Sequence, residues 1–272
     1  MRIVVCVKYV PDLQAERSLD ADGHLVRGLD DGINELDENA VEAALGLAEA
    51  AGEDTAAEVV ALAVGPDDAV DAVRRALQMG AASGVHVLDD RVAGADVMGT
   101  ARVLAAAVRT IEQDGPVDVV VTGMATMDGL SSMVPAALAA ELDRPALTLA
   151  SRVSLEGRTL TMTRSIGEAD EEQAAELPVV LSVTDQLNEP RLPGAKSLMS
   201  ARKKPVATWS LDDLAGGAEL AGDAEPGGDG ALAATTVVTA EPLPPREAGR
   251  IITDTGDAGT KLATYLVENK LV

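Results

Sequence analysis

A glycine- and serine-rich loop offers the best candidate site for chemistry in this sequence. The apolar run at residues 117–122 is followed by Gly123, and Ser131, Ser132 and Pro135 stand where the next helix should begin. Serine caps helix N-termini and proline fits the first helical turn, so backbone amides at this point would face an anion. The helix dipole also favours phosphate there. We interpret the loop as a phosphate cradle, with an ordinary well-capped turn as the alternative.

The spacing of the other reactive residues supports no catalytic centre. A Gly-x-x-x-x-Gly-Lys-Ser/Thr loop is missing, because an extra residue separates Gly194 from Lys196. His24 and His86 stand apart from any cysteine cluster, which argues against a metal site. The sequence has neither a serine nucleophile elbow nor a catalytic Cys/His motif. We therefore expect no catalysis by this chain alone and no bound metal.

The composition argues against nucleic acid and membrane partners. The chain has 272 residues and a net charge of −23, whereas a nucleic-acid groove depends on clustered Lys and Arg. No apolar run approaches the length of a membrane span, and we expect no targeting leader. The single cysteine, Cys6, lies among valines and should be a buried, reduced thiol. We expect a cytoplasmic protein without membrane insertion.

Apolar runs alternate with helical patterns through the first half of the chain. The runs typical of buried parallel strands occupy residues 3–9, 58–64, 84–88 and 117–122. Apolar residues also recur at helical spacing, at Val97, Ala101, Leu104, Val108 and Ile111. This alternation predicts an α/β fold with a doubly wound, mostly parallel, Rossmann-like sheet of the adenine-nucleotide-binding type.

The pattern changes after Pro145. Residues 152–155 and 159–163 alternate around a short turn, which predicts an added antiparallel hairpin. Residues 178–183 predict another buried strand. The acids at residues 170–172 are interpreted as solvated charge.

The chain is expected to divide into a domain, a linker and an arm. Residues 1–210 form the nucleotide-binding domain, which includes a long, proline-containing and basic segment at residues 185–204. Residues 211–240 are rich in Gly, Ala and acids and predict a flexible linker. Residues 241–272 carry prolines and a helical pattern, and this C-terminal arm is expected to pack on a partner subunit.

Two motifs in this long segment resemble the recognition loop of electron transfer flavoprotein beta subunits. That loop typically reads Asn-Glu-Pro-Arg, a short spacer, and then Ile-Met-x-Ala-Lys-Lys-Lys. The matching residues here are Asn188-Glu189-Pro190-Arg191 and Leu198-Met199-Ser200-Ala201-Arg202-Lys203-Lys204. Further segments similar to the family are Lys8 to Asp12, Asn34-Glu35, and Ala76 to Ala81. The resemblance covers the chain apart from its acidic linker.

The resemblance implies an electron carrier subunit instead of an enzyme. In that family the beta subunit pairs with an alpha subunit that holds most of a FAD, and the complex carries electrons from flavin dehydrogenases to an acceptor. The beta crevice generally binds AMP. The run Asp128-Gly129-x-Ser131-x-x-Val134-Pro135 is also similar to the loop of bifurcating relatives, whose beta crevice holds a second FAD. AMP is therefore the expected occupant, and a second FAD is the alternative.

The resemblance also assigns site residues position by position. The implied nucleotide contacts are Cys6, Lys8, Asn34, Val64, Gly65, Gly123, Thr126, Asp128, Gly129, Ser131, Ser132, Met133 and Val134. Leu13 and Leu36 are expected toward the FAD edge. The implied partner contacts are Asn188, Glu189, Pro190, Arg191, Leu192, Ala195, Leu198 and Met199.

Two positions depart from the family pattern. Ala195 stands where familiar members carry a large apolar anchor, so Leu192 or Leu198 is expected to take over docking. Arg164 is followed by Ser-Ile-Gly-Glu-Ala, where the family usually has x-x-Asp-Gly-Gly. The alternative function is a stand-alone adenine-nucleotide-binding protein of the universal-stress type, which has no need of a long partner loop. An adenylating enzyme of similar fold should show a Ser-Gly-Gly loop after the first strand, and residues 8–12 offer none.

Overall fold

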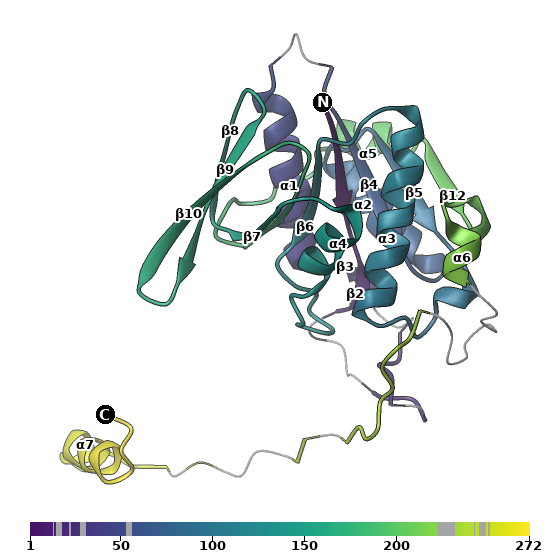
Figure 1. The fold of residues 1–272 in the computed structure, drawn as a ribbon. Coiled ribbons are helices and arrows are strands. Elements are labelled where there is room, and N and C mark those ends of the chain that lie inside the picture. The colour runs from purple at the N-terminus through teal and green to yellow at the C-terminus, as the bar shows by residue number, and fades with distance from the viewer. Residues whose placement is uncertain are drawn as a thin grey trace. The chain divides into compact units, whose positions relative to one another are not determined.

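The chain forms two compact units in this computed structural model. The structure describes residues 1–12, 14, 18–21, 23–27, 31–52, 56–221, 232–241, 243–244, 249 and 251–272. The units are Met1–Val238 and Thr239–Val272. The first contains the sheet and the candidate nucleotide and docking residues (Figure 1).

A seven-stranded parallel sheet forms the centre of the first unit. Its strands, from edge to edge, are β12 (Val206–Trp209), β5 (Ser83–Val87), β4 (Glu58–Val64), β1 (Arg2–Cys6), β6 (Val119–Gly123), β11 (Val179–Val183) and β7 (Ala146–Ala150). The chain runs outward from β1 through β4 to β5 and then returns to β6 on the other side of β1. The predicted doubly wound sheet is confirmed, and its strand order reverses between β1 and β6.

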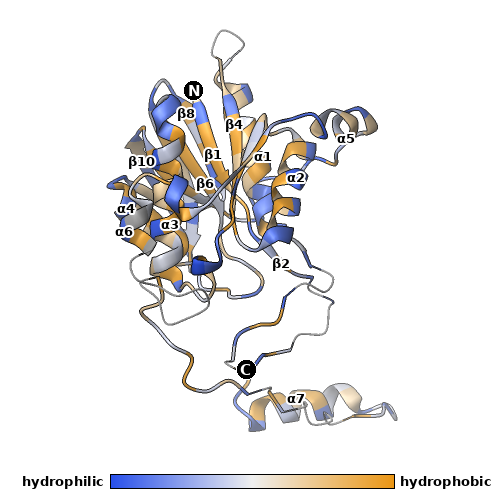
Figure 2. Cartoon of the chain, turned by 90° about the vertical axis from the view of Figure 1, so that its right-hand side faces the viewer, coloured by the Kyte–Doolittle hydropathy of each residue, from blue (hydrophilic) through white to orange (hydrophobic). Residues whose placement is uncertain are grey.

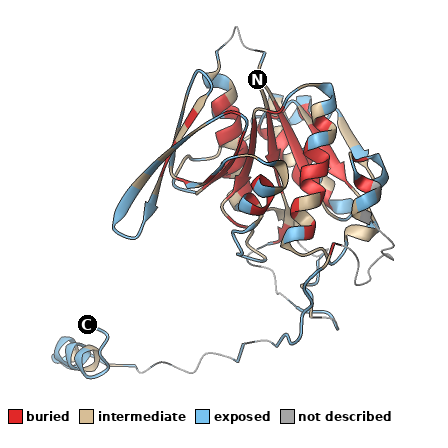
Figure 3. Cartoon of the chain, in the orientation of Figure 1, coloured by how far each residue is buried: buried red, intermediate tan, exposed pale blue. Residues whose placement is uncertain are grey.

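Helices cover both faces of this sheet. Those on one face are α1 (Glu35–Ala50), α2 (Val70–Met79) and α5 (Ala195–Ala201), and those on the other are α3 (Val97–Ile111), α4 (Val134–Leu142) and α6 (Gly217–Ala221). Ile3 and Val5 enter one core cluster while Val4 enters the other, as the two-residue period of a strand requires. Strands β1, β4 and β6 are apolar along most of their length (Figure 2), and the strands and the inner helix faces are buried (Figure 3).

The first strand is shorter than the sequence predicts. β1 ends at Cys6, and β2 (Tyr9–Pro11) pairs with β3 (Asp31–Ile33) in a separate antiparallel ladder. Between β1 and β2, the Lys8 amide donates to Asp37 Oδ2 at 2.8 Å, and the Lys8 carbonyl accepts from the Asn34 amide at 2.9 Å. These bonds to the start of α1 turn the backbone out of the central sheet.

The predicted hairpin is present and gains a third strand. β8 (Arg152–Glu156), β9 (Thr159–Ile166) and β10 (Ala169–Glu176) form an antiparallel sheet in the order β10-β9-β8. The acids at residues 170–172 thus lie in a strand, where Arg164 Nε donates to Glu171 Oε2 at 2.8 Å. The sequence of β10 is polar and has no β-branched residue, so it does not predict a strand. Pairing with β9 holds this segment in the strand conformation.

The expected linker differs from the described chain. Leu211, Leu214 and Leu232 are buried in the core cluster beside α3. A Cβ at Gly99 would lie 1.8 Å from the carbonyl oxygen of Leu232, so the missing side chain in α3 admits the backbone of this segment. Leu211, Leu214 and Leu232 therefore belong to the core of the first unit, although they lie in the region whose composition predicted a flexible linker.

Short helical elements complete the described structure. The 3₁₀ turns are η1 (Asp67–Ala69), η2 (Asp90–Val92), η3 (Glu112–Asp114) and η4 (Leu211–Asp213). In the second unit, α7 (Ala258–Glu268) follows the predicted helical pattern and has no buried residue among those described. Among the residues that the structure describes, no helix is both long and apolar enough to cross a membrane.

Candidate functional site

The carboxyl ends of β1, β4 and β6 meet at one edge of the sheet. Lys8 follows β1, Gly65 follows β4, and residues 124–133 connect β6 to α4. The N-terminus of α1 joins them through Asn34, which precedes the helix. Ligands of open α/β sheets bind at this edge, where the strand order reverses. We refer to these segments together as the crevice, after the nucleotide site expected there.

Asn34 ties the loop after β6 to the start of α1. Its side chain is fully buried, and its Nδ2 donates to the Ala125 carbonyl at 2.9 Å. Its Oδ1 accepts from the Met127 amide at 3.0 Å. Asn34 precedes α1 but makes no side-chain cap, because both ends of its amide serve the loop. Asn34 therefore holds the loop after β6 against the start of α1, and its contact with a nucleotide stays a prediction.

Asp37 lies beneath the crevice, between β1 and β6. Burial raises the pKa of its carboxyl to about 7, although hydrogen bonds from Asn34 and from the Lys8 amide oppose this shift. A Cβ at Gly123 would lie only 2.6 Å from Asp37 Oδ1 and 2.7 Å from the Leu36 carbonyl oxygen. Glycine is therefore needed at position 123 for the close approach of α1, and its expected contact with a ligand stays a prediction.

Asp128 forms ion pairs with two basic side chains in the crevice. Lys8 Nζ lies 2.8 Å from Asp128 Oδ2, and the Arg27 guanidinium also donates to this oxygen. Arg27 Nη1 donates in addition to the Tyr9 carbonyl at 3.2 Å. The sequence did not predict Arg27 as a site residue. No motif or periodicity indicates that a residue between β2 and β3 contacts the loop after β6.

The Asp128 carboxylate is buried but incompletely satisfied. Its side chain is 3% exposed, and burial alone would raise its pKa. The charge of Lys8 and hydrogen bonds from Lys8, Arg27 and Thr126 outweigh burial and hold the pKa below its ordinary value. Its Oδ1 is buried and has no hydrogen-bond partner within the described residues. An ionised carboxylate with a spare acceptor therefore lies in the crevice.

The entrance to α4 presents unbonded amides. Within the described chain, the amides of residues 131–134 donate to no other group of the protein. Leu130 and Ser132 have φ angles of 48° and 53°, in the left-handed region, and the residue before the helix is Met133. Neither serine caps α4, contrary to the expectation from sequence, because the N-cap position is occupied by Met133. The amides are thus left to face the crevice or solvent.

The remaining expected nucleotide contacts differ in accessibility. Cys6 is buried in the sheet, where burial and the nearby Asp37 raise its pKa to about 12. Val64 ends β4 and Gly65 follows it, and the Gly65 carbonyl accepts from His86 Nε2 at 3.1 Å. Gly129 is exposed beside the cations. Leu13 lies outside the described residues.

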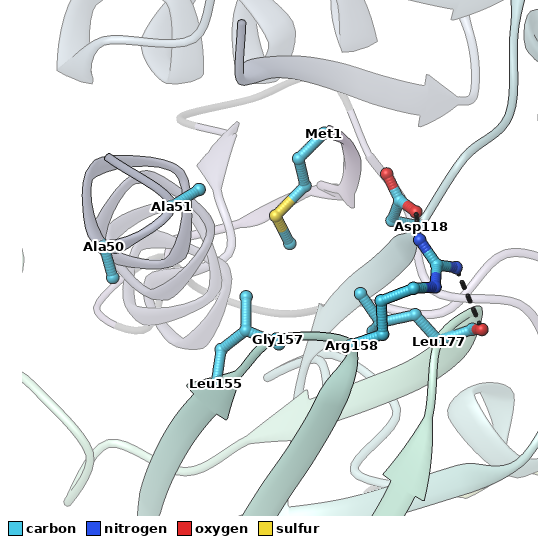
Figure 4. Close-up of a pocket in the computed structure, with 8 residues that line it drawn as sticks. All are labelled: Met1, Ala50, Ala51, Asp118, Leu155, Gly157, Arg158 and Leu177. Carbon is cyan, nitrogen blue, oxygen red and sulfur yellow. Dashed lines mark hydrogen bonds and ion pairs between the residues drawn. The ribbon is translucent and has the colours of Figure 1, made fainter. Parts of the chain in front are cut away.

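Two pockets lie elsewhere on the first unit. One of about 410 Å³ is lined by Met1, Ala50, Ala51, Asp118, Leu155, Gly157, Arg158 and Leu177 (Figure 4). It adjoins the amino end of β1, opposite the crevice, and Arg158 Nη1 is paired with Asp118 Oδ1 at 3.2 Å. A second, of about 300 Å³, is bounded by the β2 and β3 ladder and by α2. Neither contains Asp128 or the amides before α4.

The expected partner contacts lie on the outer side of α1 and α2. Leu192, Met199 and Leu198 are 88%, 72% and 42% exposed, so large apolar side chains project from this segment. Glu189 and Ala195 are exposed as well, and Pro190 is half-buried. Asn188 and Arg191 instead bond to α1. The sequence located the segment but did not separate its projecting residues from its anchored ones.

Comparison with known proteins shows the family of this chain. Residues 23–214 match the electron transfer flavoprotein domain. An electron transfer flavoprotein subunit beta of Mycobacterium bovis is 38% identical, with 99% of each chain covered. That of Megasphaera elsdenii is 32% identical over 100% of this chain and 98% of its own, and the caffeyl-CoA reductase-Etf complex subunit CarD of Acetobacterium woodii is 29% identical over the whole of both. The chain belongs to the electron transfer flavoprotein family, among its beta subunits.

Proposed function

We propose that this chain pairs with an alpha subunit to carry electrons through a shared FAD, while its own crevice binds AMP. Membership of the family makes it a component of a flavin-dependent electron carrier. The finer assignment rests on one arrangement, in which a buried acceptor oxygen, two cations and unbonded amides lie at the same edge of the sheet. These are the groups that a ribose phosphate requires.

AMP fits the crevice by the chemistry of these groups. Asp128 Oδ1 is an acceptor without a partner in the described chain, and it suits a ribose hydroxyl but repels phosphate. The amides of residues 131–134 and the cations Lys8 and Arg27 suit the phosphate. AMP supplies no redox chemistry, so its role here would be to join the loops that follow β1 and β6.

A second FAD in the crevice remains the alternative occupant. Leu130 and Met133 are 62% and 57% exposed beside the unbonded amides, and an apolar ring system could cover them. The same side chains are also suited to contact with a partner subunit. Extraction of the bound nucleotide distinguishes AMP from FAD directly.

The second unit is proposed to bind the alpha subunit. α7 has no buried residue among those described, and its Leu262 and Val267 are 51% and 65% exposed. An isolated helix of this length is marginal in water, because most helical stability in proteins comes from tertiary packing. Packing against the alpha subunit would bury this apolar surface.

Co-expression with an alpha subunit of the same family tests the proposal. The expected product is a yellow, stoichiometric complex from which FAD and AMP are extracted in equimolar amounts. A chain that lacks residues 239–272 should fail to co-purify with the alpha subunit. The matched control deletes only Leu271 and Val272, which are exposed and follow the end of α7, and it should still co-purify.

The chain expressed alone provides the contrary outcome. A colourless preparation is expected, because the one crevice is assigned to AMP. Tight retention of FAD by a demonstrated monomer would contradict the shared-flavin assignment. Normal co-purification of the chain without residues 239–272 would remove the basis for binding through the second unit.

A further inference from the structure

The segment from Asn188 to Lys204 is held to the body at both ends. At its start, the side-chain amides of Asn188 and Asn39 are interlocked. Asn39 Nδ2 donates to the Asn188 carbonyl at 3.0 Å, and Asn188 Nδ2 donates to the Asn39 carbonyl at 3.1 Å. Asn39 lies in the first part of α1 and is buried, so this exchange fixes the backbone where the segment leaves β11.

Arg191 makes four hydrogen bonds to α1. Its Nε and Nη2 donate to the two oxygens of Glu42 at 2.8 Å each, and its backbone amide donates to Glu42 Oε2 at 3.0 Å. Its Nη1 donates to Glu49 Oε1 at 2.8 Å. All three guanidinium nitrogens are thus bonded to α1. The hydrogen bonds from Arg191 hold the pKa of Glu42 below its ordinary value.

The far end of the segment is attached to α2. Lys204 Nζ donates to the carbonyls of Leu77 and Ala81 at 2.9 and 2.6 Å, at the C-terminus of that helix. The last carbonyls of a helix lack intrahelical donors and attract a cation, so this lysine satisfies the Leu77 carbonyl of α2 and the Ala81 carbonyl just beyond the helix. Ser197 also donates to the Gln78 carbonyl. A basic residue of the family-like motif is therefore engaged within the chain.

Between these anchors the apolar side chains are exposed. Leu192 directly follows Arg191, while Leu198 and Met199 lie on α5, between the anchored Ser197 and Lys204. We infer that Arg191 is a positioning residue, which clamps this segment to Glu42 and Glu49 so that Leu192, Leu198 and Met199 meet an electron donor in a preset arrangement. The inference rests on the proposed function and removes Arg191 from the set of direct partner contacts.

Presetting the segment has a defined thermodynamic effect. A loop that is ordered before binding does not lose its conformational freedom when the partner docks, so docking is tighter. Loss of the clamp should raise the KM for the donor while kcat at saturation changes little, because the flavin and its surroundings are untouched. The clamp depends on the shape of the guanidinium as well as on its charge. A lysine at position 191 would keep the charge but could not form the planar, bidentate bond to Glu42.

The experiment uses the heterodimer with the full chain and a flavin dehydrogenase that reduces the parental complex. Arg191→Gln and Arg191→Lys are compared with Arg74→Gln, which removes an equal charge from an exposed pair with Asp71 at 3.8 Å. Hydrogen exchange of residues 188–199 and the donor KM and kcat are measured for each. Both Arg191 variants should exchange faster and show about a tenfold higher KM, and Arg74→Gln should match the parent.

Glu42→Gln provides the partner test for the clamp. It should raise KM similarly, and the double variant with Arg191→Gln should be no worse than either single variant, because both remove the same bond. A parental KM in both Arg191 variants, despite faster exchange, would overturn the positioning role. A KM increase with Gln but not with Lys would also overturn it, because charge steering would then suffice. If Leu192→Ala and Leu198→Ala are also without effect, docking through the segment fails as well.

Discussion

The crevice and the docking segment both depend on α1, yet they use their polar residues in opposite ways. In the crevice, Asn34 bonds to the loop after β6, Lys8 pairs with Asp128, and one Asp128 oxygen has no partner among the described residues. In the docking segment, Asn188 and Arg191 bond to α1, and the large apolar side chains Leu192, Leu198 and Met199 remain exposed. The first arrangement suits a small polar ligand and the second suits a protein surface.

The position along α1 accounts for this difference. The helix begins at the carboxyl edge of the sheet, where Asp37 reaches the backbone of β1 and β6. Further along, Asn39 and Glu42 face the segment that follows β11. One helix therefore supports both regions, and variants at its two ends should have separable effects.

The largest expected effect follows from the burial of Asp37. This carboxyl binds its proton more tightly in the folded chain, with a pKa of about 7, than in the unfolded chain. Its contribution to stability is therefore present at low pH and is lost as pH rises from about 4 through about 7. Relative to Asp37→Asn, which does not titrate, the parental free energy of unfolding should fall by about 1–4 kcal/mol across this range.

Urea unfolding of both proteins at several pH values measures this difference. Comparison with Asp37→Asn cancels the general effect of acid on a chain with a net charge of −23. The absolute stability of the variant is expected to be lower, because an amide cannot accept from the Lys8 and Gly123 amides as a carboxylate does. Stability curves that run parallel with pH would show that Asp37 does not titrate in the folded chain.

The next effect concerns nucleotide retention. Asp128→Ala removes the spare acceptor and should weaken AMP binding by about tenfold, a loss that the released Lys8 and Arg27 partly offset. Gly129→Val should also weaken it, by blocking backbone approach. A Cβ at Gly129 meets only Thr126 Oγ1, at 3.8 Å, so the variant should fold normally.

Nucleotide extracted from the purified heterodimer and quantified by chromatography checks both variants. The matched control is Asp170→Ala, which breaks an exposed pair with Arg152 on the three-stranded sheet. It should leave AMP content at the parental level. Full AMP content in both crevice variants would place the nucleotide elsewhere.

The sequence predicted the parts of the fold that depend on continuous patterns. The buried strands and α3 appear as apolar runs and helical spacing, and both lie within a residue or two of their predicted bounds, except for the first strand. β10 and β12 were not predicted, because one is polar and the other is a short edge strand. These two segments form strands because they pair with β9 and β5. The local sequence does not indicate that pairing.

The same limit applies to the candidate site: short sequence motifs were recognised, but contacts between residues far apart in the chain were not predicted. The loop after β6 was proposed as a site from its residue types and the segment from Asn188 from a family motif, but the residues that contact them were not predicted. Arg27 reaches Asp128, and Arg191 reaches Glu42, across long separations in sequence. Gly123 was predicted from its place after β6, but its close approach to Asp37 was not predicted. Such pairings depend on the topology of the sheet.

The division of labour between crevice and docking segment is tested most directly by electron transfer to one variant heterodimer. Leu192, Leu198 and Met199 are replaced together by alanine, and flavin reduction by a donor dehydrogenase is followed by rapid mixing at subsaturating donor concentration. The account predicts parental AMP and FAD content with transfer slowed by about threefold or more, since an exposed apolar anchor is lost. Transfer at the parental rate across all donor concentrations, with cofactors intact, would contradict it.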